Sequence, residues 1–123
     1  MKYISDEDKM RVALDEARKA RDIDEVPVGA AIFDKDDNLI CANHNRRELD
    51  QNPISHAEIL VLEEASKILG TWRLEEATIV VTLEPDTMCA GAIVNARIRK
   101  LIYGAPNLKA GAAYSLYLSL IHI

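Results

Sequence analysis

The chain has 123 residues, of which 28% are charged and 49% hydrophobic, and its formal net charge at pH 7 is −5. This length suits one domain with a buried core, and the acidic balance excludes nucleic-acid binding through overall charge. No apolar run approaches the ~18 residues of a membrane span, and the acidic start of the chain is unlike a secretory signal. The cysteines, Cys41 and Cys89, make no disulfide framework, so we expect a cytoplasmic protein.

The first half of the chain predicts a helix, a hairpin and a loop. Residues 5–21 carry apolar side chains at steps of three and four, and Ser5 can cap the helix start. Residues 26–33 are typical of a buried strand, residues 34–38 of a polar turn and residues 39–43 of the returning strand. The polar residues 44–53 predict a loop.

The second half alternates helices and strands. We expect a helix over 56–69 that ends at Gly70, a strand over 78–83, a helix over 88–97, a strand over 100–105 and a loop over 106–111. No internal repeat or linker interrupts the chain. Strands separated by helices predict an α/β domain, with helices on both faces of a mixed sheet.

The lengths of these elements bring two distant stretches together. A helix of ~13 residues and a strand of ~6 residues are each ~20 Å long. A chain that runs along the helix 56–69 and returns along the strand 78–83 therefore comes back to the level of His56. We expect Asp86 and Cys89, at the start of the next helix, to lie beside His56.

These residue types favour a zinc site. Zinc binds histidine, cysteine and carboxylate ligands in a tetrahedron, so His56, Asp86 and Cys89 would leave the fourth position for water. Zinc lowers the pKa of such a water to ~7. Glu58 lies two positions after His56, in the first turn of a helix, and can move the proton of that water to a leaving group.

The motif pattern resembles the zinc-dependent nucleoside and nucleobase deaminase superfamily, and within it the bacterial tRNA-specific adenosine deaminases. The similarity runs from about Glu25 to about Ser115. Its parts are Glu25-Val26-Pro27-Val28-Gly29-Ala30, Asn45-Arg46, His56-Ala57-Glu58, Trp72-Arg73-Leu74, Val81-Thr82-Leu83-Glu84-Pro85, Cys89-Ala90-Gly91-Ala92, Arg97-Ile98, Tyr103-Gly104-Ala105 and Lys109-x-Gly111-Ala112.

The resemblance implies a three-layer α/β/α cytidine-deaminase-like fold and a role for each matched residue. His56 and Cys89 match zinc ligands, with Asp86 at the position of a third ligand, and Glu58 matches the proton shuttle. The implied substrate-binding residues are Pro27, Val28, Asn45, Ala57, Glu84 and Asn107. The implied reaction is hydrolytic conversion of adenosine to inosine at the wobble position of a tRNA anticodon stem-loop, by a homodimer with one Zn²⁺ per chain.

Three departures from the family pattern shape our expectations. Asp86 stands where the pattern has a cysteine, so we expect weaker zinc binding through a harder ligand. Asn107 stands where the family usually has aspartate. Residues 1–113 are family-like, but residues 114–123 form an apolar tail in place of the usual C-terminal helix.

Two alternatives stay open on the sequence alone. The chain could be a guanine or cytidine deaminase, although the Asn45-Arg46 and Cys89-Ala90-Gly91-Ala92 runs favour the tRNA enzyme. It could also be a catalytically impaired deaminase-like subunit that binds RNA or a partner chain, which Asp86 and the atypical tail would favour.

Overall fold

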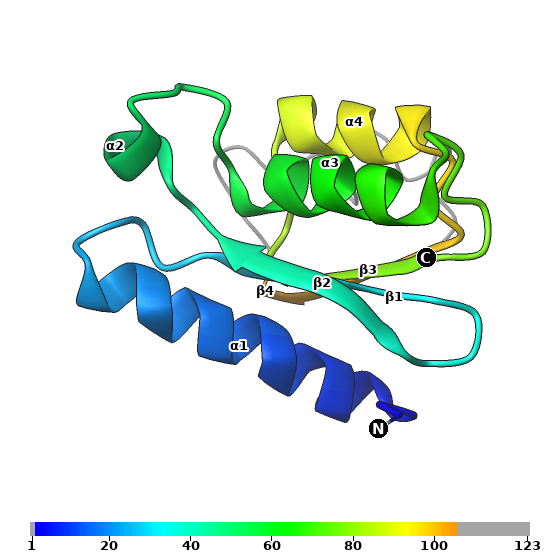
Figure 1. The fold of residues 1–123 in the computed structure, drawn as a ribbon. Helices are drawn as coiled ribbons and strands as arrows, with labels where there is room; N and C mark the ends of the chain where they lie inside the picture. Colours follow the sequence, from blue (N-terminus) through cyan, green and yellow to red (C-terminus); the bar gives the residue numbers. More distant parts are fainter. Residues whose placement is uncertain (1, 106–123) are drawn as a thin grey trace.

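The computed structural model describes residues 2–105, which form a four-stranded mixed sheet between two layers of helices (Figure 1). The strand order is β2 (Leu39–His44), β1 (Gly29–Phe33), β3 (Thr78–Leu83) and β4 (Lys100–Ala105). β1 is antiparallel to both β2 and β3, whereas β3 and β4 are parallel. The predicted α/β/α layering with a mixed sheet is confirmed.

Helix α1 (Asp6–Asp22) covers one face of the sheet. The Ser5 hydroxyl accepts a hydrogen bond from the Asp8 amide at 3.0 Å, which caps the helix as the sequence predicts. On its apolar side, Ala13 packs against a cluster that includes Phe33 and Val80.

Helices α3 (Ala57–Leu69) and α4 (Thr87–Asn95) cover the other face. Their buried side chains, among them Val61, Ala65 and Ile93, join the larger core cluster with Ile79 of β3. Gly70 adopts the left-handed conformation with φ 69° and ends α3 at the predicted position.

The structure corrects two local predictions. The expected loop over 44–53 contains a short helix, α2 (Arg47–Asp50), which has no buried residues and hence no apolar pattern to reveal it. The first strand begins at Gly29 rather than at residue 26. Pro27 lacks an N–H donor, and the Val28 amide turns back to the Val26 carbonyl at 2.8 Å instead of joining the sheet.

Several predictions fall outside the described residues: Asn107, the loop over 106–111, the absent C-terminal helix and the tail over 114–123. Within residues 2–105, none of the helices has the combination of length and apolar sequence that a membrane crossing requires.

Candidate functional site

The candidate site lies at one end of the sheet. Because β1 runs antiparallel to β2 and β3, the start of β1 and the ends of β2 and β3 meet at this end. Val28 precedes β1, Asn45 follows β2 and Glu84 follows β3. Helices α3 and α4 also begin here, so distant stretches of the chain contribute to one place.

Three metal-binding side chains converge at this end. One donor atom each from His56, Asp86 and Cys89 lies within 4.8 Å of the other two. The His56 Nδ1 atom is 3.6 Å from the Asp86 Oδ2 atom. Two ligands ~2.1 Å from a tetrahedral ion lie ~3.4 Å apart, so this spacing suits a zinc ion. An imidazole, a carboxylate and a thiol are also donor types that zinc accepts, and the residues therefore fit the implied metal.

Asp86 has a second structural role. Its side chain is the N-cap of α4, where Oδ1 accepts a hydrogen bond from the Cys89 amide at 2.9 Å. Aspartate is one of the best N-cap residues because its oxygen satisfies an amide that has no partner within the helix. The same carboxylate thus holds the start of α4 with one oxygen and faces His56 with the other.

Burial perturbs two ionisable groups next to these donors. Glu58 is 4% exposed. Burial raises the pKa of its carboxyl to about 7, and the charge of Asp86 adds to the increase. Burial also raises the pKa of the Cys89 thiol far above its ordinary value, and Glu58 and Asp86 act in the same direction. A bound cation would oppose both shifts, because it favours the negatively charged forms.

A pocket of about 120 Å³ opens beside the donor cluster. It is lined by Val26, Val28, Asn45, Arg47, His56, Ala57, Glu58, Leu83, Glu84 and Asp86. Pockets for drug-sized ligands measure ~300–1,000 Å³, so this one suits a group about the size of a single base.

Hydrogen bonds fix the orientation of Asn45 in the pocket. The Asn45 side chain is buried, and its Oδ1 atom accepts a hydrogen bond from the Arg47 amide at 3.1 Å. The buried Glu25 carboxylate accepts hydrogen bonds from the next two amides, those of Glu48 at 3.3 Å and Leu49 at 2.6 Å. Among residues 2–105 no hydrogen bond involves Asn45 Nδ2, which can therefore donate to a ligand.

The pocket contains most of the residues predicted for it, together with others that the sequence reasoning missed. Pro27 is not among its lining residues, although its neighbours Val26 and Val28 are. Leu83 also lines it and was not predicted as a site residue, whereas Arg47, which lines it too, is one of several basic residues that the sequence offers as possible phosphate contacts. The sequence signal for Arg47 was its position two residues after Asn45, but the loop predicted there gave its side chain no direction.

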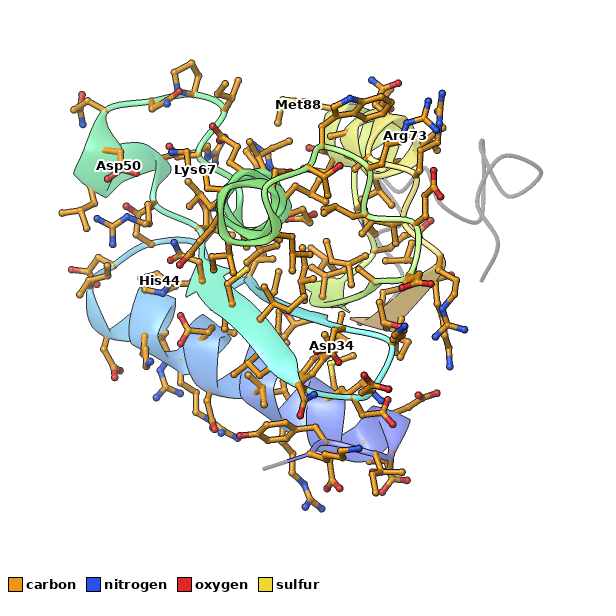
Figure 2. All side chains as sticks on the ribbon, turned by 45° about the vertical axis from the view of Figure 1, so that its right-hand side comes forward. Asp34, His44, Asp50, Lys67, Arg73 and Met88 are labelled. Atoms are coloured by element: carbon orange, nitrogen blue, oxygen red, sulfur yellow. The ribbon has the colours of Figure 1, made fainter. Side chains whose placement is uncertain are left out.

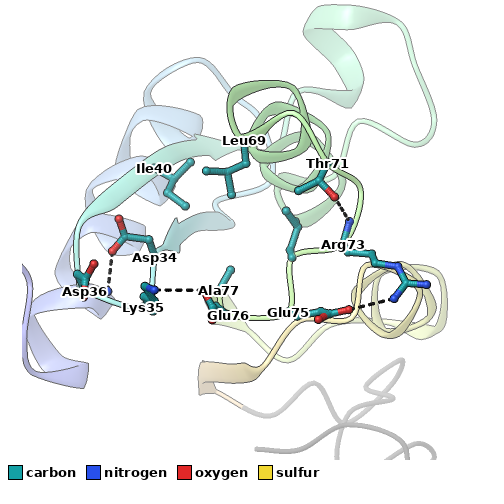
Figure 3. Close-up of a pocket in the computed structure, with 11 residues that line it drawn as sticks. Asp34, Lys35, Asp36, Ile40, Leu69, Thr71, Arg73, Glu75, Glu76 and Ala77 are labelled. Carbon is teal, nitrogen blue, oxygen red and sulfur yellow. Dashed lines mark hydrogen bonds and ion pairs between the residues drawn. The ribbon is translucent and has the colours of Figure 1, made fainter.

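A larger cavity of about 470 Å³ lies at the opposite end of the sheet, between the β1–β2 turn and the segment that follows α3 (Figure 3). Most of its charged side chains form ion pairs with one another. Arg73 pairs with Glu75 at 3.3 Å, and Lys35 lies 3.8 Å from Glu76. None of His56, Asp86 and Cys89 lines this cavity, so the smaller pocket is the better candidate site.

The α/β/α fold, the donor cluster at two helix starts and the adjacent buried glutamate define the class of cytidine-deaminase-like proteins. A family model described as MafB19-like deaminase matches residues 4–122, and the chain belongs to this family. The tRNA-specific adenosine deaminase of Bacillus subtilis (strain 168) is 50% identical over 111 residues, which cover 90% of this chain and 68% of the relative.

Solved structures agree with this relationship. A chain from a study of A-to-I editing by tRNA:A34 deaminases at the wobble position of transfer RNA has a TM-score of 0.84 and 48% identity. The match covers 87% of this chain and 82% of that one. Guanine deaminase from Bacillus subtilis is more distant at 28% identity, with a TM-score of 0.82 and coverage of 85% and 67%. The chain spans between 63% and 68% of the length of several bacterial relatives named tRNA-specific adenosine deaminase.

Proposed function

We propose that this chain catalyses the hydrolytic deamination of adenosine to inosine at the wobble position of a tRNA anticodon. The observation that carries the proposal is the donor cluster of His56, Asp86 and Cys89, which adjoins one base-sized pocket that Glu58 also lines. The higher identity to tRNA adenosine deaminases than to guanine deaminase favours adenosine over guanine as the substrate base.

The side chains divide the task between binding and proton transfer. A base inside a folded RNA reaches a small pocket only after it leaves its stack. Val28 and Ala57 supply apolar wall, and Asn45 Nδ2 donates to a ring nitrogen acceptor of adenine, such as N7 or N3. The buried Glu58 carboxyl lines the pocket and can accept a proton and release it again, so Glu58 transfers a proton to the departing amino group.

We propose that zinc is the resident metal and that His56, Asp86 and Cys89 hold it. When bound, zinc supplies an activated water as the nucleophile at neutral pH. We expect purified protein grown with zinc to contain about one ion per chain, as a mononuclear site requires. A content well below that value would contradict the ligand assignment.

Inosine formation on an anticodon stem-loop RNA, measured by mass spectrometry, tests the proposed reaction. We expect Glu58→Ala to abolish inosine formation while zinc remains bound, because the carboxylate is not among the three proposed ligands. Glu64→Ala is the matched control, since it removes an exposed carboxylate from the same helix. Tight RNA binding by the original chain without inosine would instead support a non-catalytic RNA-binding subunit.

We also propose that the protein is cytoplasmic, that it forms a homodimer and that the dimer binds tRNA. Support for the dimer comes from a groove of about 540 Å³ between α3 and α4, lined in part by Ile59, Leu62 and Trp72. Trp72 is 56% exposed there. Light scattering should give a dimer for the original chain and a monomer for Trp72→Lys, whereas Leu14→Lys on α1 should remain dimeric.

A further inference from the structure

We infer that Arg47 binds a phosphate group next to the adenosine that enters the pocket. The inference rests on the proposed function, because it names the part of the RNA that this side chain contacts. Four features of the molecule support it: the size of the pocket, the charge of its lining, the lack of a partner for the Arg47 side chain within residues 2–105, and the fixed backbone at this residue.

The pocket is too small for a whole nucleotide. A cavity of about 120 Å³ accepts a base, so the ribose and its two phosphates stay at the mouth. Arg47 is exposed and lines this pocket, so the residue lies at the mouth rather than in the interior. The residues that close the interior, Ala57 and Glu58, are buried.

The lining is otherwise unfavourable to RNA. It includes the carboxyl groups of Glu58, Glu84 and Asp86, and Arg47 is its sole lysine or arginine within residues 2–105. A phosphodiester that approaches acidic groups needs a nearby cation. The guanidinium meets this need, because its N–H groups match two phosphate oxygens at once.

The side chain of Arg47 has no protein partner in the described part of the chain. No hydrogen bond or ion pair there involves its guanidinium, whereas the preceding Arg46 pairs with Asp50 at 3.2 Å. A guanidinium that has no partner among residues 2–105, on a residue that lines a pocket with three carboxyl groups, can therefore bind an anion from solution.

The backbone of Arg47 is held firmly even though its side chain is exposed. Its amide donates to Asn45 Oδ1 at 3.1 Å, and the next two amides donate to the Glu25 carboxylate. The residue that reads the base and the residue that would bind the phosphate are thus connected by one hydrogen bond. A nucleotide with its base beside Asn45 would present a phosphate near Arg47.

The test is a double-mutant cycle between protein and RNA, measured as the Kd of an anticodon stem-loop. One RNA carries a neutral methylphosphonate on the 5′ side of the target adenosine and a second RNA carries it on the 3′ side. We expect Arg47→Gln to raise the Kd of the unmodified RNA about threefold to tenfold. We also expect a decrease of about 0.7 in the steepness of the log–log salt dependence, as for one phosphate contact to a single strand.

For one of the two modified RNAs, Arg47→Gln should cause no further loss, since the charge that it binds is already absent. Arg47→Lys should restore part of the affinity. Arg18→Gln on α1, which makes the same change in net charge on the other face of the sheet, should bind like the original chain. Circular dichroism and thermal melting should show that every variant is folded.

The inference is overturned if Arg47→Gln weakens the binding of both modified RNAs as much as it weakens that of the unmodified RNA. It is also overturned if Arg18→Gln weakens binding as much as Arg47→Gln does. Failure of the proposed function has a different signature, which is the absence of inosine when the original chain is incubated with the stem-loop. The cycle depends on binding alone, so it distinguishes the two failures.

Discussion

The two carboxylate oxygens of Asp86 face different partners. One carboxylate oxygen caps α4 through the Cys89 amide, and the other lies 3.6 Å from His56 Nδ1. A thiolate is the softer ligand and binds zinc well, but it is a weaker acceptor for a helix amide. At this residue the stability of the helix start and the affinity for metal therefore favour different side chains.

Substitutions at Asp86 should separate the two roles. Asp86→Asn keeps a good N-cap and removes the charged ligand, so we expect near-original stability of the metal-free protein with much weaker zinc binding. Asp86→Cys should bind zinc more tightly and turn over faster, while the metal-free protein loses about 1 kcal/mol of stability with the cap. Chelator competition and urea unfolding measure the two effects. An Asp86→Cys protein that binds zinc no better would show that Asp86 is not a ligand.

At the scale of the elements, α1 lies very close to the start of β1. A Cβ atom placed on Gly29 would lie 2.0 Å from the Ala13 carbonyl oxygen and 2.5 Å from the Ala17 amide nitrogen. Both are backbone atoms of α1, which cannot rotate away as the end of a side chain could. Glycine at this position lets the helix lie directly on the strand, one residue from the pocket wall at Val28.

Gly29→Ala should consequently destabilise the protein by about 3 kcal/mol or more, because the helix must move away from the sheet. Gly91→Ala is the matched control. A Cβ at Gly91 meets nothing within 4 Å, and alanine is the better helix former, so this change should stabilise α4 by up to about 1 kcal/mol. Urea unfolding compares the two variants. A similar effect of both would mean that α1 does not contact β1 as closely as described.

A second connection joins α1 to β2. The His44 Nδ1 atom lies 3.0 Å from Glu16 Oε1, and the other Glu16 oxygen accepts a hydrogen bond from Lys19 at 2.6 Å. Figure 2 shows His44 at the end of β2, close to α1. Burial raises the pKa of Glu16, but the hydrogen bonds from Lys19 and His44 outweigh it and hold the pKa below its ordinary value.

This connection should make stability depend on pH. A carboxyl with a lowered pKa in the folded state stabilises the protein above its unfolded-state pKa, and this contribution is lost as the pH falls through the folded-state pKa. We expect Glu16→Gln to cost about 1–2 kcal/mol at pH 7 and progressively less below pH ~4. Urea unfolding of both proteins across pH 3–7 measures the difference. A constant difference over this range would exclude the charge of Glu16 as its cause.

At the scale of the whole molecule, the proposed metal site connects the start of α3 with the start of α4, two helices that also pack together through the hydrophobic core. His56 precedes α3, whereas Asp86 and Cys89 belong to the start of α4. Such a site forms only when the chain is folded, so a bound ion stabilises the folded state by mass action.

Zinc should therefore raise the melting temperature of the original chain. At a free concentration 100 times the Kd, the expected gain is about 3 kcal/mol, and excess chelator should remove it. His56→Ala should show little response to either reagent, because one of the three ligands is absent. A zinc-dependent increase of the same size in His56→Ala would place the ion elsewhere.

Local sequence determined much of the architecture. The helix over 57–69, the strands over 78–83 and 100–105 and the N-cap at Ser5 lie at or within a residue of their predicted places, because periodicity, β-branched runs and capping are properties of neighbouring residues. Element lengths also sufficed to predict that His56, Asp86 and Cys89 lie together.

Tertiary structure alone decided the rest. Helix α2 has no apolar face, and the amides of its second and third residues, Glu48 and Leu49, donate to Glu25, which is 23 and 24 residues away along the chain. Contacts of this range leave no periodic trace in the sequence. The chain's sequence by itself determined its class of fold and the chemistry of its donors. Only the folded structure decided which side chains line the pocket and which have no partner within residues 2–105, because those positions depend on residues that are neighbours in space alone.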